Sequence, residues 1–155
     1  MPFCYIRLHA QKPVSTAYPT ELKTLGDHIR KKRLDRGLLQ KDVAKMLGTN
    51  TASILNWELN RMSTSIEFIP GIIEFLGYMP YESTSEMSFG EKIVTCRKIK
   101  GISQKELARQ LGFDPGTVAH WESNSRKPAG PYLEALNAFL VPIISEFVEN
   151  AYQPE

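Results

Sequence analysis

Long apolar runs are missing from this sequence. No stretch approaches the roughly 18 consecutive apolar residues of a membrane-spanning helix, and Arg7 and His9 interrupt the only N-terminal stretch that could form a signal-peptide core. Cysteine is scarce, since Cys4 and Cys96 are the only two and neither has a Cys or His neighbour at metal-ligand spacing. These absences argue against a membrane protein, a disulfide framework and a metal site. We therefore expect a cytoplasmic protein with reduced thiols.

Signatures of catalysis are also missing. The three histidines, His9, His28 and His120, are scattered along the chain. The sequence has no glycine-rich loop of the kind that cradles phosphate and no nucleophile in a recognised setting. We predict that the chain is not an enzyme and needs no cofactor.

Strong net charge is absent as well, because the formal charge is only +2. Its distribution is uneven: residues 25–80 hold eight Lys/Arg against six Asp/Glu, residues 89–140 hold eight against five, and residues 141–155 hold three Glu and no Lys or Arg. Two mildly basic units therefore precede an acidic tail. This pattern suits attraction to phosphate, and it equally suits two solvated basic surfaces.

An internal duplication is what the sequence does contain. Residues 25–77 align with residues 89–141 at a constant offset of 64 without a gap, and fourteen of the 53 aligned pairs are identical. Unrelated sequences of average composition would share on the order of three. A length of 155 residues suits two small domains. We predict an N-terminal arm (1–24), a first domain (25–80), a linker (81–88), a second domain (89–141) and an acidic C-terminal helix or tail (142–155).

Each copy has the apolar spacing and the capping residues of four or five short helices, which predicts an all-α fold. Capping pairs open the first helices, Asn50 and Asp114 open the third helices, and Asn60 and Asn124 can end them in the left-handed conformation. Fourth helices are predicted over roughly 66–77 and 131–140. Pro142 is expected to begin one more helix, over 143–150.

The segments 40–60 and 104–124 carry the most specific pattern. Ala44 and Ala108 stand where two helices must cross closely, and Gly48 and Gly112 stand in a turn that favours positive φ. A bulky side chain would force either joint apart. The apolar residues around them fall on faces that must be buried, so we interpret them as core; they are Val43, Leu47, Ile54 and Trp57 in the first copy and Leu107, Leu111, Val118 and Trp121 in the second.

These residues resemble the phage-repressor and Cro-like helix-turn-helix family, of the xenobiotic-response-element type, in both copies. The marks are the initial Gln, the Ala and Gly four and eight positions later, and Trp-Glu-x-Asn, where members often have Gly last. The resemblance covers about two thirds of the chain. It implies two tandem lambda-repressor-like domains that bind specific double-stranded DNA sequences, commonly as repressors or antitoxins, with each third helix in the major groove.

Site residues are implied by the same resemblance. Gln40 and Gln104 would hold phosphate, and Arg126 and Lys127 would grip the DNA backbone. The base-facing positions would be Thr51, Ala52, Ser53 and Asn56 in the first copy, and Pro115, Gly116, Thr117 and His120 in the second. The pairs Arg33 with Glu58 and Arg97 with Glu122 resemble a structural ion pair of the family. On the first helix, Arg30, Lys31, Lys32 and Arg36 are further candidates for phosphate contact.

Two departures from the family pattern leave alternatives open. The first copy has Met-Ser-Thr-Ser at 62–65 where the second has a basic loop, and the second copy has Pro115 and Gly116 among its reading positions. One repeat could read bases while the other grips phosphate. The repeats could also form a protein-interaction scaffold, such as an antitoxin or coactivator, in which one repeat does not bind DNA. The chain could act as a homodimer or as an intramolecular pseudo-dimer.

Overall fold

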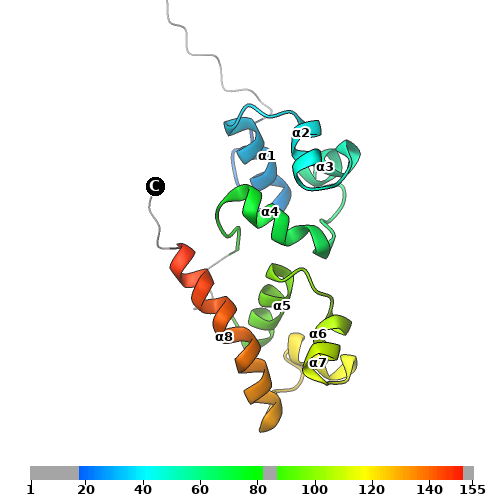
Figure 1. Cartoon of the computed structure of the whole chain (residues 1–155), viewed down its shortest axis with the longest axis vertical. Helices are drawn as coiled ribbons and strands as arrows, with labels where there is room; N and C mark the ends of the chain where they lie inside the picture. The colour runs from blue at the N-terminus through cyan, green and yellow to red at the C-terminus, as the bar shows by residue number, and fades with distance from the viewer. Residues whose placement is uncertain (1–17, 82–86, 152–155) are drawn as a thin grey trace, which may run out of the picture.

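The computed structural model describes residues 18–81 and 87–151, with side chains through Glu146, and all regular structure in these residues is helical. The first unit contains α1 (Leu25–Asp35), α2 (Gln40–Met46), α3 (Thr51–Glu58), the 3-10 turn η1 (Ile66–Phe68) and α4 (Ile69–Leu76). The second contains α5 (Phe89–Ile99), α6 (Gln104–Leu111), α7 (Pro115–Glu122) and α8 (Pro131–Ala151). Figure 1 shows the units stacked along the long axis. The predicted all-α fold of two repeats is confirmed.

Side-chain caps fix where the helices begin. Reciprocal capping boxes open α1 (Thr24 with Asp27) and α5 (Ser88 with Glu91), as predicted. The side chains of Asn50 and Asp114 accept backbone N–H groups in the first turns of α3 and α7. These local bonds satisfy N–H groups that would otherwise lack partners, which explains why such short helices have definite starts.

Each unit has its own apolar core. The first core contains Ile29, Val43, Ile54, Trp57 and Ile72, and the second contains the equivalent residues Ile93, Leu107, Val118, Trp121 and Leu136. The core interpretation of the duplicated apolar positions is therefore confirmed, with Leu47 and Leu111 partly buried at its edge. Two separate cores mean that each unit positions its own third helix.

Pro142 lies inside α8, so the prediction that it begins a separate helix is wrong. A proline inside a helix removes one backbone hydrogen bond and costs about 3 kcal/mol. Leu140 and Ile143, on either side of it, are 2% and 3% exposed and pack in the same core, while Pro142 itself is exposed. Apolar packing on both sides of the proline therefore carries the helix through. The side chains of Phe147 and Val148, in the last part of the helix predicted over 143–150, lie outside the described residues.

The two units touch through α4 and α5. A cleft at this junction is lined by Trp57, Met62 and Ile69 of the first unit, by Tyr81 after it, and by Lys98 of α5. The first unit therefore contacts the second directly, in addition to the covalent connection.

The ends of the chain are only partly described. Tyr18 donates a hydrogen bond to Asp35 at the end of α1, while the predicted arm up to residue 17 lies outside the described residues. Among the described helices, none combines the length and apolar character that crossing a membrane requires.

Candidate nucleic-acid interface

A tight turn joins the second and third helices of each unit. Gly48 and Gly112 have φ of 66° and 71°, the left-handed region that glycine adopts without strain. Just after each glycine, a backbone N–H returns to the second helix: Thr49 N donates to Ala44 O at 2.9 Å, and Phe113 N donates to Ala108 O at 2.8 Å. The predicted turn is confirmed in both copies. It sets α3 across α2, and α7 across α6.

One face of each third helix is buried and the other is open. In α3, Ile54 is fully buried and Trp57 is 4% exposed, while Thr51 and Ala52 face solvent. In α7, Val118 and Trp121 are buried to the same extent, while Pro115 and Gly116 are exposed. The N-terminal turn of each helix, which lies farthest from the tryptophan, is therefore the part available to another molecule.

A buried ion pair fixes α3 to α1. Arg33 Nε and Nη2 donate to the two carboxylate oxygens of Glu58 at 2.6 and 2.8 Å, and Arg33 Nη1 donates to Leu38 O at 3.1 Å. The Glu58 side chain is only 2% exposed. In the second unit, Arg97 makes the same bidentate bonds to Glu122 at 2.8 and 3.1 Å. The predicted structural pairs are confirmed, and both planar forks hold a third helix at a fixed angle.

The glutamines that begin α2 and α6 join these networks. Gln40 Nε2 donates to Glu58 at 2.9 Å, and Gln104 Nε2 donates to Glu122 at 2.6 Å. An amide group has a second N–H and a carbonyl oxygen besides the bonded N–H, and both glutamines are half-buried. Their side chains are therefore oriented by the same carboxylates that anchor the third helices.

The end of each third helix is fastened to the start of the first helix. Asn60 and Asn124 have φ of 54° and 56°, as predicted. Asn60 Nδ2 donates to Asp27 at 3.1 Å, and Asn124 Oδ1 accepts from the backbone N–H of Gly90 at 3.0 Å. A Cβ at Gly90 would lie 2.5 Å from the Trp121 carbonyl oxygen, which explains the duplicated glycine. The asparagine side chains thus add contacts that glycine at the same place could not make.

Comparison with known proteins agrees with this geometry. The helix-turn-helix family model matches residues 29–82 and 93–140, which together make about two thirds of the chain.

The chain belongs to the Cro/C1-type helix-turn-helix family, with two tandem copies. As a member of that family it is a DNA-binding protein. It is also similar to an uncharacterized HTH-type transcriptional regulator of Archaeoglobus fulgidus, with 36% identity over 64 residues. That match covers 41% of this chain and 27% of the relative, so the chain spans about a quarter of that protein. No solved structure matches the chain.

The positions predicted to face bases differ between the two copies in what they expose. Thr51 and Ala52 are exposed, and Ser53 and Asn56 are half-buried at the rim of the α3 face. In α7, Thr117 is half-buried and His120 is exposed, with His120 Nδ1 3.0 Å from Ser125 Oγ. A Cβ at Gly116 would lie 2.8 Å from the carboxylate of Asp114, which caps α7, so a larger side chain at position 116 would crowd this cap. The two copies therefore present different surfaces on the same frame.

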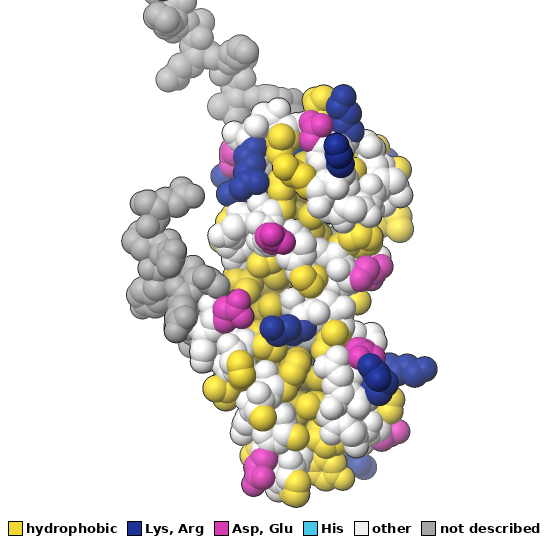
Figure 2. Space-filling view, viewed as in Figure 1, with side chains coloured by type: hydrophobic (Ala, Val, Ile, Leu, Met, Phe, Trp, Pro, Cys, Tyr) yellow, Lys and Arg dark blue, Asp and Glu magenta, His cyan; other side chains and the backbone are white. Residues whose placement is uncertain are grey.

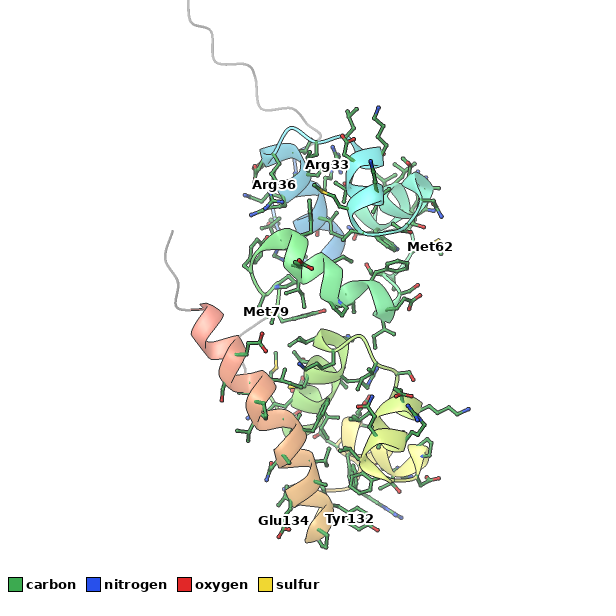
Figure 3. The ribbon with its side chains drawn as sticks, viewed as in Figure 1. Arg33, Arg36, Met62, Met79, Tyr132 and Glu134 are labelled. Atoms are coloured by element: carbon green, nitrogen blue, oxygen red, sulfur yellow. The ribbon has the colours of Figure 1, made fainter. Side chains whose placement is uncertain are left out.

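The basic residues fall into two groups. Arg126 and Lys127, which the resemblance places at the DNA backbone, are exposed in the loop after α7. On α1, Lys32 lies over the Tyr78 ring, Arg36 lies over the Phe75 ring, and Lys31 pairs with Asp35 at 2.8 Å. Figure 3 shows Arg36 on the side of the first unit away from α3. Lys32 of α1 and Arg36, which follows α1, therefore lie against α4 and the residues just after it.

Sequence reasoning missed Arg61, which is exposed directly after α3. Its equivalent in the second copy is Ser125, so a search for shared residues passes over it. Arg109 on α6 is engaged locally: its two bonds to Glu106, at 2.6 and 2.9 Å, are the main cause that lowers the pKa of Glu106 to about 2. On the face of the molecule that Figure 2 shows, Lys and Arg side chains form separate spots and no continuous patch. Arg61 is thus a candidate phosphate ligand of the first copy.

In the described part of the chain, no group of three or more His, Cys, Asp or Glu is arranged to hold a metal ion. Cys96, the free thiol among the described residues, is 1% exposed, and burial raises its pKa to about 11. It is a neutral core residue at physiological pH.

Proposed function

We propose that the chain is a sequence-specific transcriptional regulator that acts as a repressor, and that α3 and α7 enter the major groove of double-stranded DNA. The observation that carries the proposal is the division of each third helix into a buried face, fixed by an Arg–Glu fork, and an open N-terminal turn. A rigidly held helix with an open turn is what groove reading requires. The A. fulgidus relative, described as a transcriptional regulator, supports the same reading.

Phosphate contacts hold the protein on the duplex in this proposal. Gln40 and Gln104, oriented by Glu58 and Glu122, each have a remaining amide N–H for a phosphate oxygen. Arg126 and Lys127 add two positive charges beside α7. These contacts set orientation and affinity but carry no sequence information.

Base recognition resides mainly in α3. Thr51 and Ser53 offer hydroxyl groups, and Asn56 offers an amide that can pair with adenine N6 and N7 together. In α7, Pro115 and Gly116 have no hydrogen-bonding side chains, so Thr117 and His120 carry what discrimination the second copy makes. The first repeat is then the principal reader. Occupancy of its site would block other proteins from the same DNA, which is the simplest route to repression.

A second candidate function is a protein-interaction scaffold in which the second repeat does not touch DNA. Pro115 and Gly116 favour it, because they leave the first two positions of α7 without side-chain hydrogen-bond donors or acceptors. Under this alternative, changes in the second repeat leave the affinity for DNA unaltered.

Salt titration of duplex binding tests the proposal. Affinity for duplexes selected from a random pool should fall steeply with salt, with a slope of roughly −0.9 per neutralised phosphate. Gln40→Ala should weaken specific and scrambled duplexes alike, and Gln104→Ala should do the same if the second repeat is engaged. A folded protein without affinity for any duplex at low salt contradicts the proposal. Loss on Gln40→Ala without loss on Gln104→Ala supports the scaffold alternative.

A further inference from the structure

The two repeats meet through faces that are not equivalent. The first repeat contributes the start of α4, and the second contributes the end of α5. An ideal Cβ on Gly101, which follows α5, would lie 2.8 Å from Pro70 Cγ of the first repeat. The equivalent glycine of the first repeat, Gly37, has open space at the same distance. Among the described residues, the glycine that follows the first helix therefore meets the other repeat in the second copy and not in the first.

A pair of equivalent clefts shows the same asymmetry. The cleft beside Trp57 is lined by residues of the first repeat, by Tyr81 and by Lys98 of the second repeat. The matching cleft beside Trp121 is lined by residues of the second repeat alone, among them Phe89, Arg126 and Leu133. Within residues 18–81 and 87–146, the cleft of the first repeat thus includes a residue of the other repeat, and the cleft of the second repeat does not.

The sequence of the first helices follows this difference. Three neighbouring charged residues of α1, Lys31, Lys32 and Asp35, are replaced in α5 by three residues of lower polarity, Thr95, Cys96 and Ile99. Thr95 and Cys96 are buried, at 8% and 1% exposure, and Ile99 is half-buried. Cys96 lies in the core of the second repeat, and α5 packs against α8 as well as α4, so these three uncharged residues stand on the helix that is covered on more sides.

Contact between unlike faces is heterologous, and a two-fold axis between the repeats would require the same face from both. Two domains that dock on a straight duplex in the same way can be related in two ways. A two-fold axis between them places their half-sites in opposite orientations, as an inverted repeat. A screw rotation along the DNA places the half-sites in the same orientation, as a direct repeat. In Figure 1 both units present their second and third helices on the right, and α4 and α8 both rise toward the left. This arrangement matches the screw.

We propose that one chain reads an asymmetric DNA site made of two unlike half-sites in the same orientation. The inference rests on the proposed function, because it assumes that α3 and α7 both enter grooves. The half-sites are unlike because the reading positions differ, with Thr51 and Asn56 in one repeat matched by Pro115 and His120 in the other. A single chain completes such a site, whereas a palindrome requires two chains.

Four duplexes test the arrangement with the full-length chain. They are the site selected from a random pool, that site with the half-site of the second repeat inverted in place, that site with the same half-site scrambled, and a palindrome built from the half-site of the first repeat. Footprinting assigns the half-sites, and sedimentation counts chains per duplex.

We expect one chain on the selected site, at least tenfold weaker binding to both the inverted and the scrambled versions, and two chains on the fully occupied palindrome. Inversion keeps base composition and spacing, so an equal loss from inversion and scrambling shows that orientation is read. Three results overturn the inference: a selected site with two-fold symmetry bound by two chains, full affinity after inversion, or full affinity after scrambling. Each of them leaves sequence-specific binding intact, whereas failure to bind any duplex rejects the proposed function itself.

Discussion

Removing the Glu58 carboxylate should destabilise the first repeat strongly. Glu58 accepts three hydrogen bonds, two from Arg33 and one from Gln40. In Glu58→Ala the Arg33 guanidinium, whose side chain is 12% exposed, remains buried without its counter-charge. Breaking a buried pair from one side costs about 3–5 kcal/mol, because the remaining charge is desolvated and uncompensated. Replacing both partners with apolar residues of similar size costs far less.

The double substitution Arg33→Met with Glu58→Met therefore provides the critical comparison. We expect it to recover most of the stability that Glu58→Ala loses, whereas Glu74→Ala, at an exposed site on α4, should change the free energy of unfolding by no more than about 0.5 kcal/mol. Urea unfolding followed by Trp57 fluorescence in a Trp121→Phe background reports on the first repeat alone. If the double variant is no more stable than Glu58→Ala, or if Glu58→Ala resembles Glu74→Ala, the buried-fork account is wrong.

Three further substitutions test separate parts of the structure. Gly37→Ala and Gly101→Ala each place a Cβ at positive φ, at a cost of about 1–2 kcal/mol. In Gly101→Ala the Cβ also lies against Pro70 of α4, so the melting temperature of this variant should fall further than that of Gly37→Ala, and equal losses would contradict the interface. In a Cys4→Ser variant, the Cys96 thiol should resist a thiol reagent until the chain unfolds, because burial raises its pKa to about 11; immediate labelling would contradict its burial. Pro142→Ala should raise the melting temperature, because it restores a backbone hydrogen bond within α8; a lower melting temperature would contradict a continuous helix.

Much of each repeat could be predicted because its determinants are local or duplicated. Capping by Thr24 and Asn50 follows from neighbouring residues, and positive φ at Gly48 follows from the tight turn. The pair of Arg33 and Glu58 connects positions far apart in the sequence, but the same two residue types recur 64 positions later, which allowed the pair to be predicted. The resemblance to a family added the expected roles of the third helices.

Features that depend on three-dimensional packing escaped sequence reasoning. Pro142 has the local signature of a helix start, yet burial of Leu140 and Ile143 in one core overrides it. The contact between α4 and α5 joins unlike faces of the two repeats, so the duplication gave no indication of it. The orientation of Gln40 toward Glu58 likewise depends on how α2 crosses α3, which no spacing in the sequence specifies.

Base discrimination by Asn56 is the most direct test of the claim that the protein reads DNA through its third helices. Affinities of the wild type, Asn56→Ala and His120→Ala are measured on the selected duplex and on a scrambled duplex at one salt concentration, with thermal melting to show that each variant folds. A lost bidentate contact is worth about 1–3 kcal/mol, so Asn56→Ala should lower the ratio of specific to scrambled affinity by roughly 5- to 150-fold, and His120→Ala by less. If only His120→Ala lowers the ratio, the second repeat is the reader. An unchanged ratio in both variants would contradict base reading by α3 and α7.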